Sequence, residues 1–136
     1  MTEILLVDDN RMMRGALKQL IECEPDFKVC AEAGNAVDAL ESLEHFDPDV
    51  VLVDISLSGN RNGIQLISDM RAKGYKCPIL AISLHSEMLY AKKVFEVGAQ
   101  GYLTKQDAAE NIVRAIKTII FSKDEFFTLM SASRVE

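Results

Sequence analysis

The sequence predicts a doubly wound α/β domain, in which helices cover both faces of a parallel sheet. Two observations carry this prediction: short apolar runs recur along the 136 residues, and segments with helical spacing of apolar side chains lie between them. Continuous apolar runs are typical of strands buried on both faces of a parallel sheet. Strands that alternate with helices along the chain are the pattern of the α/β class.

The apolar runs define five expected strands. They are Ile4–Val7, Phe27–Ala33, Val50–Val53, Pro78–Ser83 and Gly101–Lys105. The second run is more mixed in composition than the others, whereas the third consists almost entirely of β-branched residues, which favour strands. The first and third runs are each followed by an aspartate.

The segments between these runs have apolar residues at the 3.6-residue period of a helix. The apolar positions are Met12, Met13, Ala16, Leu17, Leu20 and Ile21 in the first segment; Ala36, Leu40 and Leu43 in the second; Ile64, Leu66, Ile67 and Met70 in the third; Met88, Leu89, Val94 and Val97 in the fourth; and Ile112, Val113, Ile116, Ile119 and Ile120 in the fifth. Gly98 follows the fourth segment and is expected to end that helix.

Right-handed crossovers leave few topologies for five strands and five helices in alternation. Among these we expect the flavodoxin-like (βα)5 arrangement, a five-stranded parallel sheet with strand order 2-1-3-4-5. Periodicity by itself does not determine that order. In such a sheet the ligand site lies beyond the carboxyl ends of the strands, where the strand order reverses.

Composition limits the classes of function. The length fits one domain, and the net charge is −6. Nucleic acid requires a basic surface, so DNA binding is expected only through a further, missing C-terminal domain. The N-terminal apolar run lacks a basic start, and no run is long enough to span a bilayer. We therefore expect a cytoplasmic protein without a membrane partner.

The C-terminal residues lie outside the ten predicted elements. We place the domain at residues 1–121 and interpret residues 122–136 as a C-terminal extension or the start of a linker to an absent effector domain. The stretch from Glu125 to Met130 is apolar enough to extend the last helix or to form a short helix of its own.

Polar side chains stand at the ends of four expected strands. Asp8 and Asp9 follow the first strand, Asp54 follows the third, Ser83 ends the fourth and Lys105 ends the fifth. Because the carboxyl ends of parallel strands meet at one edge of the sheet, we expect these side chains to converge. Each residue type alone is common in loops and helix caps, and only the joint pattern indicates a site.

Three carboxylates at close quarters repel one another and require a cation. At 4 Å and an effective dielectric constant near 20, each pair of like charges costs about 4 kcal/mol. Mg²⁺ removes this cost, since it prefers one or two carboxylates together with water and a phosphate oxygen. Asp54 is then a nucleophile that attacks phosphorus and forms an aspartyl phosphate. Lys105 neutralises charge on the phosphoryl group, and Ser83 donates a hydrogen bond to it.

These residues stand in motifs that resemble the receiver domain of two-component response regulators. The motifs are ILLVDDNRMMR, DPDVVLVDISLSG, PILAIS and GAQGYLTK, in the family's order and at its intervals. Each motif alone is unspecific, but the combination is highly specific. The resemblance covers residues 3 to about 121.

The resemblance implies a role for each acidic residue. Asp54 is implied to be the phosphoacceptor, which receives its phosphoryl group from a sensor histidine kinase. Asp8 and Asp9 are implied to hold Mg²⁺ with Asp54, and Asp9 to bind the metal directly. The backbone carbonyl of Ser56 is implied to complete the metal site.

The resemblance also implies a conformational switch. Ser83 and Lys105 are implied to contact the phosphoryl group. In the family, the hydroxyl on the fourth strand moves toward that group while an aromatic side chain on the fifth strand turns inward. Here the aromatic residue is Tyr102. The switch changes the partner-binding face formed by the fourth helix, the fifth strand and the fifth helix.

Three positions depart from the family pattern. Ser58 replaces a proline, and Gly63 follows the phosphoacceptor by nine residues where the family has eight. The loop Ser58–Asn62 therefore carries about one extra residue. Gln106 stands where a proline normally follows the lysine, so we expect a trans bond there. None of these changes removes a phosphorylation residue.

Within the family, the sequence is most similar to receivers of LuxR/NarL-type transcription regulators, which carry a C-terminal helix-turn-helix domain. The resemblance therefore implies the regulatory part of a DNA-binding transcription regulator, and a homodimer is compatible with it. The alternative is a stand-alone receiver that acts by protein–protein interaction, with or without phosphate.

Two functions of other classes fit less well. A phosphatase of the haloacid dehalogenase type requires a second aspartate two residues after the first, and Ser56 occupies that position. In a flavodoxin the first loop cradles a phosphate, which Asp8 and Asp9 would repel. We therefore expect a phosphoacceptor switch and not an enzyme that turns over an external substrate.

Overall fold

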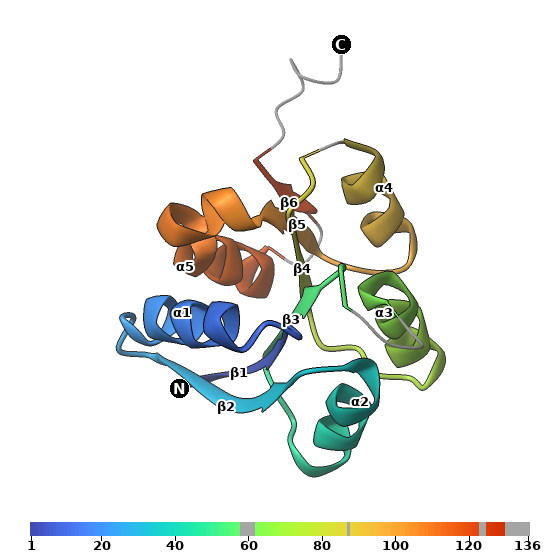
Figure 1. Cartoon of the computed structure of the whole chain (residues 1–136), viewed down its shortest axis with the longest axis horizontal. Coiled ribbons are helices and arrows are strands. Elements are labelled where there is room, and N and C mark those ends of the chain that lie inside the picture. Colours follow the sequence, from blue (N-terminus) through green and yellow to red (C-terminus); the bar gives the residue numbers. More distant parts are fainter. Residues whose placement is uncertain (58–61, 87, 123–124, 130–136) are drawn as a thin grey trace.

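One parallel sheet forms the framework of the molecule. The computed structural model describes residues 1–57, 62–86, 88–122 and 125–129, and in them it shows six strands in the order β2-β1-β3-β4-β5-β6 (Figure 1). The strands are β1 (Thr2–Val7), β2 (Phe27–Ala33), β3 (Val50–Asp54), β4 (Ile79–Ser83), β5 (Gly101–Thr104) and β6 (Phe127–Thr128). The predicted order is confirmed for β1 to β5, but the prediction of five strands is wrong.

Helices cover both faces of this sheet, with α1 and α5 on one face and α2, α3 and α4 on the other (Figure 1). Their bounds are α1 Arg11–Glu22, α2 Ala36–His45, α3 Gly63–Ala72, α4 Met88–Glu96 and α5 Lys105–Phe121. All five lie where the apolar spacing predicts them. In the described part of the chain, none of them is long and apolar enough to cross a membrane.

Polar side chains fix the starts of four helices. Asn10, Asn35, Asn62 and Thr104 each accept a hydrogen bond from the amide of the third helical residue, at the starts of α1, α2, α3 and α5 respectively. Such N-caps satisfy backbone donors that have no partner within the helix. Three of these caps, Asn10, Asn35 and Thr104, lie at the carboxyl edge of the sheet, within three residues of the ends of β1, β2 and β5.

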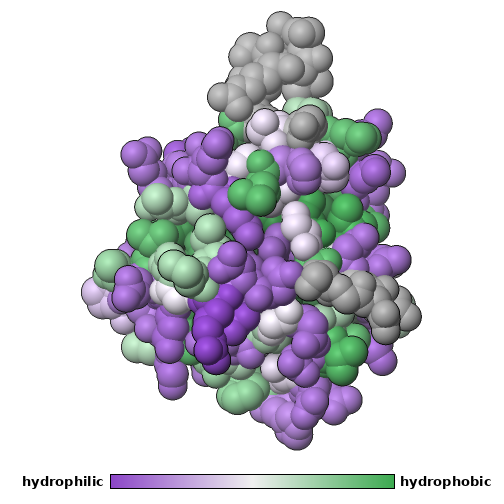
Figure 2. Space-filling model, viewed as in Figure 1, coloured by the Kyte–Doolittle hydropathy of each residue, from purple (hydrophilic) through white to green (hydrophobic). Residues whose placement is uncertain are grey.

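The side chains of each strand alternate between two apolar clusters. On β1, Leu5 and Val7 pack with the α2–α4 layer, whereas Ile4 and Leu6 pack with α1 and α5. This alternation follows from the period of two along a strand. The face of the molecule seen in Figure 2 is mostly hydrophilic, and its hydrophobic residues form separate patches.

The sixth strand corrects the prediction for the C-terminal residues. Phe127 and Thr128 pair with Gly101 and Tyr102 of β5 in parallel, so the predicted helix is wrong for residues 125–129; Met130 lies outside the described residues. Phe126 packs against the α2–α4 cluster and Phe127 against the α1–α5 cluster. A strand places consecutive side chains on opposite faces, as this burial requires. The domain boundary at residue 121 stays a prediction.

Candidate functional site

The carboxyl edge of the sheet brings the predicted site residues together. β3 lies between β1 and β4, with Val53 opposite Val7 and Asp54 opposite Ile82. Asp8 therefore begins the loop beside Asp54. Ser83 ends the neighbouring strand opposite Thr104 of β5. The site lies where the order of the strands reverses, as expected for this class of fold.

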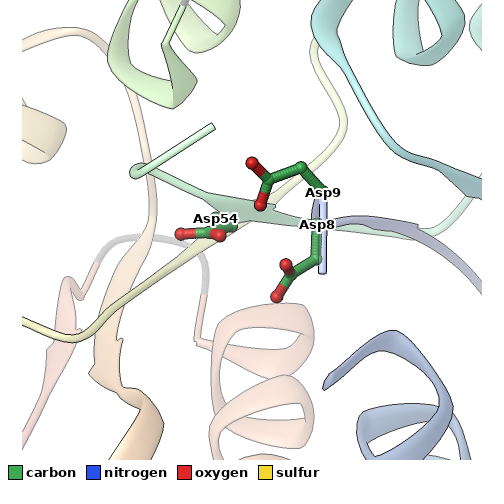
Figure 3. A group of neighbouring side chains, drawn as sticks. All are labelled: Asp8, Asp9 and Asp54. Carbon is green, nitrogen blue, oxygen red and sulfur yellow. The ribbon is translucent and has the colours of Figure 1, made fainter. Parts of the chain in front are cut away.

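Three carboxylates form the centre of the site. Asp8, Asp9 and Asp54 each offer an oxygen, and these oxygens all lie within 4.8 Å of one another (Figure 3). Asp8 and Asp54 are 1% and 2% exposed, whereas Asp9 is exposed. Figure 3 shows the carboxylates of Asp8 and Asp9 leaving the end of β1 on opposite sides. The prediction that the three carboxylates converge is confirmed.

Lys105 bridges the two buried carboxylates. Its Nζ lies 3.2 Å from Asp8 Oδ2 and 3.2 Å from Asp54 Oδ2. The contact with Asp54 has hydrogen-bond geometry, while the contact with Asp8 is an ion pair only. Lys105 was predicted to end a strand, but it is the first residue of α5. It reaches the site because Thr104 ends β5 and caps that helix.

Burial shifts the ionisation of this pair. Burial raises the pKa of the Asp54 carboxyl, and the charge of Asp8 adds to the rise, against the Ser56 amide and the charge of Lys105. Burial alone lowers the pKa of the Lys105 ammonium, but the charges of Asp54 and Asp8 outweigh it and raise that pKa overall. Without a further cation, the site favours a cationic lysine and disfavours an ionised Asp54.

The donor set fits a hard divalent cation. Asp8 Oδ1 accepts a hydrogen bond of 2.8 Å from the Asn10 amide, but the buried Asp8 Oδ2 accepts none from the described residues. The two buried carboxylates of Asp8 and Asp54 share the single Lys105 ammonium, and the exposed Asp9 adds a third carboxylate to the group. Carboxylate oxygens are the ligands that Mg²⁺ prefers. Ser56 lies beside them, and its amide donates to Asp54 Oδ1 at 2.9 Å.

The predicted switch residues, Ser83 and Tyr102, both form hydrogen bonds with the backbone of His85. Ser83 is fully buried, and its Oγ accepts a hydrogen bond of 2.9 Å from the His85 amide. Tyr102 is 1% exposed, and its hydroxyl donates to the His85 carbonyl. The His85 ring itself is exposed and stacks on Tyr90, with 4.5 Å between ring centroids. Sequence reasoning missed this link, because any residue type supplies a backbone amide and carbonyl.

The loop that follows Asp54 is described again from Asn62 onward. The predicted change at Ser58 and most of the lengthened loop, residues 58–61, lie outside the described residues. Gly63 begins α3 against the backbone of the acidic strand: a Cβ there would lie 2.3 Å from the Asp54 carbonyl oxygen. Gly63, which comes one residue later in the sequence than the glycine of the family pattern, therefore lies beside Asp54 at a place where a side chain has no room.

A second residue missed by sequence reasoning is Arg14. Its guanidinium donates to the backbone carbonyl of Asp8 at 2.6 Å and contacts the Glu32 carboxylate at 3.4 Å. It thereby ties α1 and β2 to the acidic loop. The signal in the sequence that could have indicated this contact was a basic residue one turn into the first predicted helix.

The peptide bond after Lys105 is trans, as expected, since the described residues contain no cis peptide.

Known proteins resemble this chain over most of its length. The family model of the response regulator receiver domain matches residues 4–117. The nitrate/nitrite response regulator protein NarL of Escherichia coli K12 is 34% identical over 113 residues, which cover 83% of this chain and 52% of that protein. The chemotaxis protein CheY of Halobacterium salinarum is 32% identical over 118 residues, which cover 87% of this chain and 96% of that protein.

A solved structure agrees with the sequence comparisons. The crystal structure of a two-component response regulator of the LuxR family from Aurantimonas sp. SI85-9A1 matches with a TM-score of 0.86 and 34% identity, covering 99% of this chain and 94% of that chain. The chain spans about half the length of the curated transcription regulators that it matches.

Proposed function

The chain belongs to the family of response regulator receiver domains, and from this premise we propose that it is a switch that accepts a phosphoryl group on Asp54. The observation that carries the proposal is the buried contact of Lys105 with both Asp54 and Asp8, beside the exposed Asp9. This arrangement combines a nucleophile, a fixed cation and two further oxygen ligands at one open edge of the sheet.

Asp54 is the nucleophile in the proposed transfer. One of its carboxylate oxygens attacks phosphorus, a new P–O bond forms, and the bond from phosphorus to the donor breaks, so that the donor leaves with the electron pair. The Ser56 amide and the Lys105 ammonium hold the two carboxylate oxygens of Asp54. They orient the carboxylate before the phosphoryl group arrives, which lowers the entropic cost of the reaction.

Mg²⁺ is the proposed cofactor, held by Asp8, Asp9, Asp54 and the backbone carbonyl of Ser56. When bound, it neutralises the charge of the carboxylates and of the transferred phosphoryl group. The buried Asp8 Oδ2, which accepts no hydrogen bond from the described residues, supports this proposal. Lys105 is the second cation in the proposal, and its contact with Asp54 at 3.2 Å supports a role in binding a phosphoryl oxygen.

The proposed response to phosphorylation begins at Ser83. Its hydroxyl proton is available for a phosphoryl oxygen, since the hydrogen bond from His85 uses Ser83 Oγ only as an acceptor. Movement of Ser83 displaces the His85 backbone, whose carbonyl binds the Tyr102 hydroxyl. The position of Tyr102 thereby depends on the state of Asp54, and so does the face formed by α4, β5 and α5.

The proposed partners follow from the relatives. We propose a sensor histidine kinase as the phosphoryl donor, and the regulatory part of a DNA-binding transcription regulator as the setting. Relatives named as transcription regulators, of which this chain matches about half, support the second proposal. The match to 96% of CheY supports the alternative, a stand-alone receiver that acts by protein–protein interaction. A reading frame that continues into a helix-turn-helix domain decides between them.

Intact mass spectrometry after incubation with acetyl phosphate tests the proposed acceptor and cofactor together. We expect addition of one phosphoryl group that requires Mg²⁺, is lost in Asp54→Asn, and is retained in a matched control, Asp47→Asn, at an exposed aspartate on the opposite edge of the sheet. Phosphate uptake by Asp54→Asn equal to that of the wild type would overturn the site assignment. Sustained turnover of acetyl phosphate in excess of slow hydrolysis would instead indicate an enzyme.

A further inference from the structure

We propose that β6 is a displaceable strand whose docking on β5 is coupled to the inward position of Tyr102. Segment 125–129 is then the element of this chain that detects the state of the switch. The inference rests on the proposed function, because it assumes that a phosphoryl group on Asp54 favours the inward ring.

The docked strand is held on the α5 side of the sheet by Phe127. Its amide donates to the Gln100 carbonyl at 2.9 Å, and its ring is 8% exposed within the α1–α5 cluster. The Arg114 guanidinium lies 5.6 Å from the centre of that ring. The backbone of Phe127 packs against Gly101, where a Cβ would approach within 3.3 Å of it. The backbone of Phe127 therefore packs closely against the outer edge of β5.

On the α4 side, β6 lies beside the switch. Thr128 pairs with Tyr102, so the two side chains stand on the same face of neighbouring strands, which lie roughly 4.7–4.9 Å apart. Phe126 packs edge-on against Phe95 of α4, with 5.3 Å between ring centroids, and contacts the cluster that contains Tyr102. A cavity of about 270 Å³ lies between β6 and the loop after β4, lined by Ser86, Tyr102, Thr128 and Leu129 among others.

This packing makes the two events interdependent. A Tyr102 ring that leaves the His85 carbonyl must swing toward solvent past the outer edge of β5. In the docked state Thr128 pairs with Tyr102 at that edge, and Phe126 packs against Phe95 of α4. The docked strand therefore stabilises the inward ring, and an outward ring disfavours docking. A strand of two residues has few contacts to lose, so the free energy needed to undock β6 is small.

Coupling between two sites is reciprocal, and both directions can be measured. Beryllofluoride with Mg²⁺ serves as the phosphoryl mimic. We expect it to slow hydrogen–deuterium exchange of the Phe127 amide, which donates to the Gln100 carbonyl in the docked state, about tenfold, within the range typical of allosteric coupling. In return, Phe127→Ser is expected to weaken beryllofluoride binding about tenfold. The matched control is Phe121→Ser, at a phenylalanine of α5 that is 83% exposed.

The two proposals fail in different ways. Absence of beryllofluoride binding, read from fluorine NMR, contradicts the proposed function itself. Binding with unchanged or faster exchange at the Phe127 amide overturns the coupling, and this wild-type measurement stands even where Phe127→Ser unfolds. Equal loss of beryllofluoride affinity in the Phe127→Ser and Phe121→Ser variants also overturns it.

Discussion

At the scale of single residues, Gly63 is a tightly constrained neighbour of Asp54. It follows the N-cap Asn62 and lies against the backbone of Asp54 and Ile55. A Cβ at this position would lie 2.3 Å from the Asp54 carbonyl oxygen and 2.4 Å from the Ile55 Cα. Both are backbone atoms of a buried strand end, which cannot yield as a flexible side chain does.

Gly63→Ala is therefore expected to lower the free energy of unfolding by about 3 kcal/mol, the upper end of the usual cost of overpacking. It should also weaken Mg²⁺ binding, because α3 must move away from Asp54. The matched control is Gly15→Ala, since a Cβ on Gly15 in α1 meets nothing within 4 Å. There alanine should raise stability by about 0.5–1 kcal/mol through its higher helix propensity. Urea denaturation measures both; a neutral Gly63→Ala would contradict the close approach.

The identities of the site residues were predictable, but their contacts were not. The ends of apolar runs located Asp8, Asp54 and Ser83, because parallel strands present their carboxyl ends at one edge. Their order did not show that Lys105 would begin a helix and bridge two carboxylates. The role of the His85 backbone was equally hidden, since it depends on loop geometry and not on residue type.

At the scale of elements, a single arginine joins α3 to the turn between α4 and β5. The guanidinium of Arg71 donates to the carbonyls of Gly98 and Tyr75, at 2.8 and 2.7 Å, and to Gln100 Oε1 at 2.9 Å. Gly98 has φ +108, and a Cβ there would lie 2.9 Å from the Arg71 side chain. The predicted helix end at Gly98 is thus confirmed by its left-handed conformation.

Replacing this arginine by lysine is expected to destabilise the fold, because an ammonium group cannot donate to three acceptors in one plane. Arg71→Lys should lower the free energy of unfolding by about 1–3 kcal/mol, the usual cost of leaving partly buried acceptors without a donor. Hydrogen exchange should also increase in the turn at Gly98. The control Arg11→Lys changes an exposed residue of α1 and should stay within about 0.5 kcal/mol of the wild type. Equal stability of the two variants would show that the contacts of Arg71 contribute little.

Elements with long periodic patterns were predictable, whereas β6 was not. Five helices of nine or more residues give a clear 3.6-residue period. Segment 125–129 is too short for its period to be read. Its strand conformation depends on a distant partner, the free edge of β5, which becomes available only when the sheet is assembled. Contacts of that kind leave no local signal in the sequence.

At the scale of the whole molecule, the fold imposes an electrostatic cost at its functional edge. Two carboxylates that are almost fully buried share one lysine, in a protein whose net charge is −6. Residues at ligand sites commonly reduce stability in this way. The sheet topology creates the cost, because it brings the ends of β1 and β3 together. A bound cation would remove this cost.

Removal of the Asp54 charge should therefore stabilise the metal-free protein at neutral pH. The pKa of Asp54 is raised in the folded state, mainly by burial, so the folded state binds the proton more tightly than the unfolded chain does. Stability then falls as the pH rises from 3.8, the usual pKa of an aspartate, through the raised pKa of Asp54, and the cost is complete above it. In EDTA at pH 7, Asp54→Asn should melt on the order of 2–5 °C above the wild type, and the difference should shrink as the pH is lowered. Mg²⁺ should stabilise the wild type more than the variant, by mass action. A variant that melts below the wild type in EDTA would mean that the ion pair with Lys105 outweighs the burial of the charge.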